Sequence, residues 1–129
     1  SSSSAASDVY KRQGLAYIGN KKVMLFGGHD ESTEFSETWE FDLDNSNWTK
    51  LTITGNIPTK RSSNSMSYLV DNKVLLFGGE SQGNCYDDTW IFDLSEKSWT
   101  EVETTTKPSY RMYHESSFIS LNRVLTFRR

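Results

Sequence analysis

The sequence lacks the features that mark several large classes of protein. Of 129 residues only Cys85 is a cysteine, so no disulfide can form within the chain. Lysine and arginine are scattered over a chain of net charge -3, without the basic stripe that a phosphate backbone needs. No stretch approaches the roughly 20 apolar residues of a membrane span, and Ser1–Ser7 has neither the charged start nor the apolar core of a signal peptide. We therefore expect no nucleic-acid partner, no membrane span and a cytoplasmic location.

Groups that carry catalysis are equally scarce. His29 and His114 are the only histidines, and neither has a metal-ligand spacing to Cys85. The sequence contains no Gly-x-Ser-x-Gly nucleophile motif and no phosphate-cradling loop. Acidic residues occur in loops without a fixed spacing, as at Asp87 and Asp88, which is typical of solvated charges. The sequence therefore predicts no catalytic residue, no metal site and no cofactor.

What the sequence does contain is an internal repeat. The segment Lys22–Gly28 returns as Lys73–Gly79, and Thr38–Leu43 returns as Thr89–Leu94, each displaced by 51 positions. A third copy begins at Ser117 and reaches Phe127. A fixed period near about 50 residues is typical of architectures in which each unit buries its apolar faces by stacking on its neighbours.

Each repeat is predicted to form four strands, named a to d. In the second repeat they are expected at residues 66–70, 74–77, 89–94 and 99–103. Asp71-Asn72 suits a tight hairpin, and Gly78-Gly79 ends strand b because glycine accepts positive φ and close backbone approach. The continuous apolar run Val74–Phe77 predicts burial on both faces, and the polar strand d is expected outermost. No run keeps helical spacing, so the predicted class is all-β.

Seven points in each copy resemble the kelch repeat: a Gly-Gly pair, a Trp, Phe-Asp, a second Trp, then Pro and Arg. In the first copy they are Gly27-Gly28, Trp39, Phe41-Asp42, Trp48, Pro58 and Arg61. In the second copy they are Gly78-Gly79, Trp90, Phe92-Asp93, Trp99, Pro108 and Arg111. The resemblance covers about residues 15 to 127 and is nearest to Rab-effector and acyl-CoA-binding kelch proteins. It implies an all-β, partial kelch-type β-propeller of four-stranded antiparallel blades, with strand a at the central axis.

The period predicts blade 1 over residues 15–64, blade 2 over 65–115, and the first strands of a truncated third blade over 116–129. Residues 1–14 are expected to be disordered or artefactual, because Asp8–Gln13 resembles the translation of a transposon end used in sequencing libraries. Arg128 and Arg129 stand where two glycines are expected, which we interpret as truncation or a frame error. Terminal sheets of so short a propeller would have bare faces, so the remaining blades of the same propeller are expected partners.

The resemblance implies a protein-protein interaction module, because the loops between strands b and c and the connections from d to the next a share one rim in kelch propellers. The b–c loops differ between the repeats while the strands nearly coincide, as expected of a display scaffold. The predicted partner-binding residues are His29, Asp30, Glu34, Phe35, Arg61, Glu80, Gln82, Asn84, Tyr86, Tyr110, Arg111 and Tyr113. For Arg61 and Arg111 the alternative is an ion pair or stack between blades, and for His29 and His114 it is a structural role.

The alternative function is a fragment of a galactose-oxidase-like kelch enzyme. That family site requires copper ligands and a cysteine cross-linked to a tyrosine. Cys85 and Tyr86 are adjacent in one loop, which does not supply a cross-link between strands, and the histidines have no metal partners. We therefore expect a binding module and not an enzyme.

Overall fold

The structure is a computed structural model, and it describes residues 14–109 and the backbone of 114–120 and 123–128. Over these residues every regular element is a β-strand, which confirms the predicted all-β class. Within the same part of the chain, no helix has the length and apolar character to cross a membrane.

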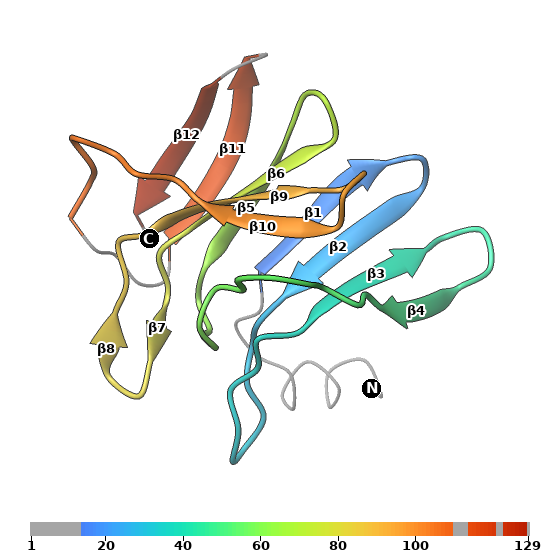
Figure 1. Cartoon of the computed structure of the whole chain (residues 1–129), viewed down its shortest axis with the longest axis horizontal. Coiled ribbons are helices and arrows are strands. Elements are labelled where there is room, and N and C mark those ends of the chain that lie inside the picture. The colour runs from blue at the N-terminus through green and yellow to red at the C-terminus, as the bar shows by residue number, and fades with distance from the viewer. Residues whose placement is uncertain (1–13, 110–113, 121–122, 129) are drawn as a thin grey trace.

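Two four-stranded antiparallel sheets follow one another along the chain (Figure 1). The first sheet consists of β1 (Gly14–Gly19), β2 (Lys22–Phe26), β3 (Thr38–Asp42) and β4 (Asn47–Lys50). The second sheet consists of β5 (Ser65–Leu69), β6 (Lys73–Phe77), β9 (Thr89–Asp93) and β10 (Ser98–Glu101). Two hairpins complete the fold: β7 (Glu80–Ser81) with β8 (Asn84–Cys85), and β11 (His114–Ser120) with β12 (Arg123–Arg128). The strand order in both sheets runs from a to d, so the predicted outermost position of strand d is confirmed.

The first strands of successive sheets, β1, β5 and β11, lie beside one another. Strand β5 contacts β1 on one side and β11 on the other. Figure 1 shows the sheets arranged like a fan with these first strands near its middle. Each sheet falls within one of the predicted blade ranges apart from Gly14, whereas β11 begins at His114, before the predicted start of the third unit at 116. The blade boundaries themselves stay predictions.

The two sheets share one register of strand pairing. One row of neighbouring residues across the first sheet is Tyr17, Val23, Phe41 and Trp48. The matching row across the second sheet is Tyr68, Val74, Phe92 and Trp99. Because every member is displaced by the repeat period, a side chain in one sheet has a direct equivalent in the other.

The turn predicted at Asp71-Asn72 is confirmed, and a second turn is held by an aspartate. Asp71 and Asn72 have φ values of 60° and 57°, as a type I′ hairpin turn requires. The side chain of Asp93 accepts the backbone N–H groups of Ser95 and Glu96 at 2.9 and 3.0 Å. This aspartate therefore fixes the turn between strands c and d.

The glycine pairs allow two backbones to approach closely. The segment after Pro58 passes between the Gly27-Gly28 and Gly78-Gly79 pairs, all four of which have positive φ. A Cβ atom on Gly79, at φ 104°, would lie 2.7 Å from the carbonyl oxygen of Ser62. The close approach that the sequence predicted is therefore the contact between one blade and the next.

Gly79→Ala is expected to destabilise the protein by about 2 kcal/mol or more, because it adds a backbone clash to the cost of positive φ. Gly55→Ala is the matched control, since Gly55 has φ 83° and open space around the added Cβ. Equilibrium urea unfolding should show a clearly larger loss for Gly79→Ala. Equal losses in the two variants would mean that the close approach to Ser62 is unimportant.

The main core lies between the two sheets. From the first sheet it contains the buried side chains of Ala16, Ile18, Met24 and Phe26. From the second sheet it contains Met66, Val74, Leu76, Trp90, Phe92 and Trp99. On the other face of β6, Phe77 is buried and Leu75 is half-buried, so the predicted burial of this strand on both faces is confirmed, with the second face less completely covered.

Trp99 ties the second sheet to the first. Its ring lies 5.1 Å from the ring of Phe26 and 4.9 Å from that of Phe92, measured between centroids. Its indole N–H donates to the hydroxyl oxygen of Thr38, at 3.2 Å, across the interface. A buried indole with a satisfied N–H contributes both a large apolar area and a directional contact.

The equivalent tryptophan of the first sheet is in a different environment. Trp48 is 46% exposed, whereas Trp99 is 4% exposed. Leu15 and Tyr17, on the same face as Trp48, are 53% and 59% exposed. This face, which we call the open face of the first sheet, is formed by Leu15, Tyr17, Val23, Leu25, Trp39, Phe41, Leu43 and Trp48. The second sheet buries the matching face against the first.

Candidate functional site

Two loops of the predicted recognition rim are folded into small hairpins. In the first b–c loop, residues 28–35, a β-bridge joins His29 to Glu34. The carboxylate of Asp30 accepts the backbone N–H groups of Ser32 and Thr33 at 2.8 and 2.7 Å. The second b–c loop, residues 79–86, forms the β7–β8 hairpin through a turn at Gln82-Gly83. Both loops therefore have defined backbones, although their sequences differ.

A cleft of about 410 Å³ lies between these two loops. It is lined by His29, Asp30, Glu31, Ser32, Thr33, Glu34, Lys60, Ser62, Glu80, Gln82 and Gly83. At its base Ser62 and Glu80 exchange backbone hydrogen bonds of 2.9 and 2.8 Å, and the hydroxyl of Ser81 donates to the carboxylate of Glu34. The cleft is therefore assembled from both repeats and from the connection between them. The Ser81–Glu34 hydrogen bond links the two loops that form its sides.

The lining of the cleft is predominantly acidic. Among the described residues, the lining contains four carboxylates, from Asp30, Glu31, Glu34 and Glu80, and one lysine, Lys60. The backbone N–H groups of Ser32 and Thr33 hold the pKa of Asp30 below its ordinary value of 3.8. Asp30 is therefore ionised at neutral pH, and acidic side chains outnumber basic ones among the described lining residues.

His29 contributes a ring nitrogen to the same cleft. Its Nδ1 lies 2.9 Å from the backbone carbonyl oxygen of Asp30, a distance at which an Nδ1–H group donates to that oxygen. Its Nε2 is buried and makes no hydrogen bond with the described residues.

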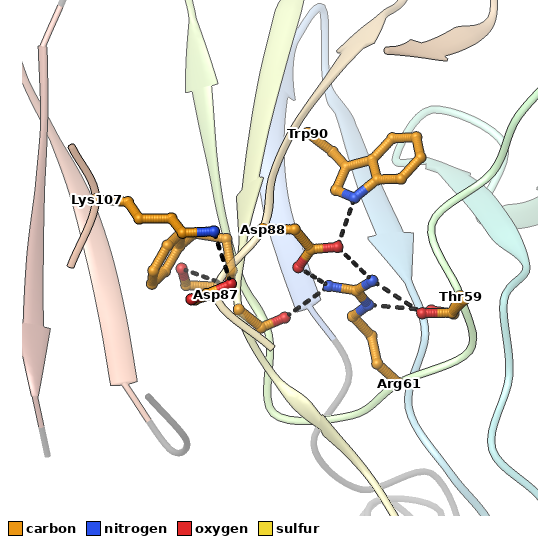
Figure 2. Close-up of polar contacts among 9 residues, drawn as sticks. Thr59, Arg61, Asp87, Asp88, Trp90 and Lys107 are labelled. Carbon is orange, nitrogen blue, oxygen red and sulfur yellow. Dashed lines mark hydrogen bonds and ion pairs between the residues drawn. The ribbon is translucent and has the colours of Figure 1, made fainter. Parts of the chain in front are cut away.

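Beside the cleft, Arg61 joins the connection after blade 1 to the second sheet (Figure 2). Its side chain is 1% exposed, and its guanidinium binds both oxygens of Asp88 at 2.6 and 2.9 Å. The remaining N–H groups donate to the backbone oxygens of Gly78 and Thr59 and to the hydroxyl of Thr59 at 3.0 to 3.1 Å. The guanidinium carbon also lies 4.3 Å from the ring centroid of Tyr86. All five donors of the arginine are therefore satisfied within the protein.

The charge of Asp88 follows from these contacts. Burial, the largest single influence, raises the pKa of Asp88, but the Arg61 guanidinium and the indole N–H of Trp90 together lower it below the ordinary 3.8. A folded-state pKa below the unfolded value means that the pair stabilises the fold above about pH 4, and this contribution is lost as the pH falls through the lowered value. The pair is therefore fully formed at neutral pH.

Comparison with known proteins agrees with this arrangement of sheets and loops. The family model described as the KLHDC2/KLHL20/DRC7 Kelch-repeats domain matches residues 4–127. The chain belongs to the kelch-repeat family. The match confirms the predicted family and, with the two sheets, the interpretation of each repeat as a kelch blade.

The relatives of this kelch chain have varied names. It is 29% identical over 112 residues to acyl-CoA-binding domain-containing protein 5 of Arabidopsis thaliana, covering 85% of this chain and 17% of the relative. It is 29% identical over 114 residues to human kelch domain-containing protein 1, covering 87% and 28%. The human Rab9 effector protein with kelch motifs is 26% identical over 117 residues, covering 88% and 32%. The chain thus spans less than a third of each of these relatives.

The structure brings five of the predicted partner-binding residues together. His29, Asp30, Glu34, Glu80 and Gln82 all line the cleft between the kelch b–c loops. Phe35, Asn84 and Tyr86 belong to the same two loops but lie outside the lining. Tyr110, Arg111 and Tyr113 lie outside the described residues. The role of all these residues in binding stays a prediction.

Arg61 requires a correction. A side chain that is 1% exposed with every donor satisfied does not reach a partner, so the alternative of an ion pair and stack between blades describes Arg61. Asp88 also differs from the expectation of a solvated loop acid, because it is the arginine's partner. The signal for Asp88 was present in the repeat, since an acidic residue stands two positions before the strand c tryptophan in both copies, at Glu37 and Asp88.

The other lining residues were not predicted from the sequence. They are Glu31, Ser32, Thr33, Lys60, Ser62 and Gly83. Lys60 and Ser62 flank the buried Arg61, and their place in the lining depends on the path of the connection. Among the residues that the structure describes, no group of three His, Cys, Asp or Glu side chains could hold a metal ion.

Proposed function

We propose that this kelch chain is part of a protein-binding module that recognises a basic segment of its partner in the cleft between the two b–c loops. The observation that carries the proposal is the cleft itself, which is built from two loops that differ in sequence on strands that repeat. Variable loops on a constant frame are typical of binding scaffolds. The names of the kelch relatives point to different cellular roles, so the partner is not set by the family.

The chemistry of the cleft favours a partner with lysine or arginine. Among the described residues, four carboxylates and one lysine line the cleft. Carboxylates bind guanidinium and ammonium groups through charge-assisted hydrogen bonds. The partner belongs to the cytoplasm in this proposal, consistent with a half-buried cysteine, Cys85, that forms no disulfide.

The proposal includes no enzymatic activity. Cys85 and Tyr86 lie next to each other at the end of the second loop, and the ring of Tyr86 stacks under Arg61. That arrangement supports a structural role for the tyrosine.

A charge-graded peptide assay tests the proposal. Short fluorescent peptides ranging from strongly basic to strongly acidic are titrated with the protein, and only the basic ones are expected to bind. Glu31→Gln with Glu80→Gln should weaken binding of the basic peptides about 5- to 30-fold at low salt, because an exposed and a half-buried carboxylate contribute about 1–2 kcal/mol together.

The matched control is Glu101→Gln with Glu103→Gln, which removes the same charge from exposed positions on and just after β10. It should change binding by less than about twofold, because salt screens the attraction between the bound peptide and exposed charges far from the cleft. Equal weakening by the control pair would show that net charge, and not the cleft, attracts the peptide. Stronger binding of acidic peptides would refute the proposal.

A further inference from the structure

The protein itself shows how it binds a guanidinium group (Figure 2). Arg61 places its two terminal nitrogens on the two oxygens of Asp88, at 2.6 and 2.9 Å, in the bidentate geometry that carboxylates offer to arginine. Its guanidinium carbon also lies 4.3 Å from the ring centroid of Tyr86. An arginine site built in this way needs a carboxylate with both oxygens available and an aromatic face.

The carboxylate of Asp30, in the cleft between the b–c loops, does not offer both oxygens. Its Oδ1 accepts the backbone N–H groups of Ser32 and Thr33 at 2.8 and 2.7 Å, and the hydroxyl of Ser32 lies 3.3 Å from the same oxygen. The two backbone donors already occupy both lone pairs of Oδ1. None of these contacts uses Oδ2, so Asp30 presents one oxygen to a ligand in the cleft.

The carboxylate of Glu34 is held from the opposite loop. The hydroxyl of Ser81 donates to Oε2 of Glu34, and because Ser81 is buried, the position of this donor is fixed. The contact does not use Oε1. Asp30 and Glu34 are both half-buried, and each is held through one oxygen while the other oxygen stays outside the contact that holds it.

The lining also lacks an aromatic face. No phenylalanine, tyrosine or tryptophan occurs among the described residues that line the cleft. Tyr86, from the second loop, lies against Arg61 instead, and Phe35, from the first loop, is outside the lining. Guanidinium groups and methylated ammonium groups both gain binding energy from aromatic rings. The cleft therefore lacks both features that bind Arg61 elsewhere in the same protein.

From these observations we propose that the cleft binds an unmodified lysine side chain in preference to arginine, with the ammonium group donating to Oδ2 of Asp30 and Oε1 of Glu34. An ammonium group is compact and carries three N–H donors on a flexible stem, so single oxygens from different carboxylates satisfy it. Glu31 and Glu80 add negative charge to the same cleft. The lysine preference rests on the proposed function, because it specifies the basic group that the cleft recognises.

A contact of this kind is sensitive to modification of the lysine. Acetylation removes the charge, whereas trimethylation keeps the charge and removes the N–H donors. The contact uses both the charge and the donors, and the described lining has no aromatic cage that would bind a trimethylated group. Both modifications are therefore expected to weaken binding, so the cleft distinguishes an unmodified lysine from its modified forms.

Four fluorescent peptides of one sequence test this preference with the 129-residue protein. Every basic position of the peptide carries lysine in the first, arginine in the second, trimethyl-lysine in the third and acetyl-lysine in the fourth. Binding is measured by fluorescence anisotropy at low salt. The lysine peptide should bind at least about fivefold more tightly than the arginine and trimethyl-lysine peptides, and the acetyl-lysine peptide should bind most weakly.

Asp30→Asn tests the oxygen that is assigned to the ligand. Asparagine keeps an Oδ1 that accepts the two backbone N–H groups, but it places an N–H donor where Oδ2 accepts from the ammonium group. The lysine peptide should bind about 5- to 10-fold more weakly, with the melting temperature nearly unchanged. Asp93→Asn is the matched control, because Asp93 accepts the backbone N–H groups of Ser95 and Glu96 in the same way and lies outside the cleft lining.

The possible results separate the lysine preference from the proposed function. If the arginine or the trimethyl-lysine peptide binds as tightly as the lysine peptide, the preference is wrong and the recognition of basic segments stands. Equal weakening by Asp30→Asn and Asp93→Asn would likewise contradict the contact with Oδ2. If neither the lysine nor the arginine peptide binds, the proposed function itself is wrong, and the preference fails with it.

Discussion

Replacing Arg61 by methionine should lower the free energy of unfolding by about 3 kcal/mol. The substitution leaves the Asp88 carboxylate without its partner inside the interface, and breaking a buried ion pair from one side costs about 3–5 kcal/mol. The lower end of this range applies because the side chain of Asp88 keeps 19% exposure. Equilibrium urea unfolding followed by far-ultraviolet circular dichroism measures the loss.

Lys21→Met is the matched control for Arg61→Met. It removes a lysine that lies 3.2 Å from Asp44, with both side chains more than two thirds exposed. Such surface pairs contribute roughly 0–1 kcal/mol. If Arg61→Met also costs less than about 1 kcal/mol, the ion pair with Asp88 does not hold the two blades together.

Trp99→Ala should cost about 3–5 kcal/mol, the usual loss for a large buried aromatic side chain. It removes the ring packed between Phe26 and Phe92 and the hydrogen bond to Thr38. Trp48→Ala, at the equivalent repeat position, should cost about 1 kcal/mol or less, because nearly half of its side chain is already in water. Both values come from the same urea titration.

The two tryptophans control for each other, since they occupy the same repeat position in strand d and pair with strand c in the same register. A difference of at least about 2 kcal/mol is expected from their different burial. Equal losses would mean that burial between sheets is not what distinguishes the two positions. A larger loss for Trp48→Ala would contradict the assignment of the open face.

The strands and turns were predictable because their determinants are local. The hairpin at Asp71-Asn72 needs residues that accept positive φ, and the sequence supplies them at the turn itself. The same holds for the glycine pairs and for the turn aspartate, Asp93. Repetition made these local signals stronger, because each was present twice in the same order.

The features that one repeat by itself does not determine depend on neighbours far along the chain. Trp48 and Trp99 are indistinguishable in sequence pattern, and only the presence of a facing sheet makes one buried and the other exposed. Arg61 finds its partner, Asp88, 27 residues later, in the next blade. Its burial could not be seen from its own surroundings in the sequence, although the alternative of a contact between blades was recognised.

The candidate site combines both kinds of information. Five of its lining residues were predicted because the b–c loops differ between repeats. The cleft also needs Lys60 and Ser62, which the chain brings there by passing between two glycine pairs. A cleft formed by separate repeats is a property of their stacking, which a single loop sequence does not contain.

Hydrogen exchange at increasing urea concentration tests most directly the central claim that the two sheets stabilise each other. Peptides from β1–β4 and peptides from β5, β6, β9 and β10 are followed separately by mass spectrometry. Because the shared core lies between the sheets, both sets should become exchange-competent at the same urea midpoint. If one sheet exchanges fully while the other stays protected through a separate transition, the sheets are independent units and the account is wrong.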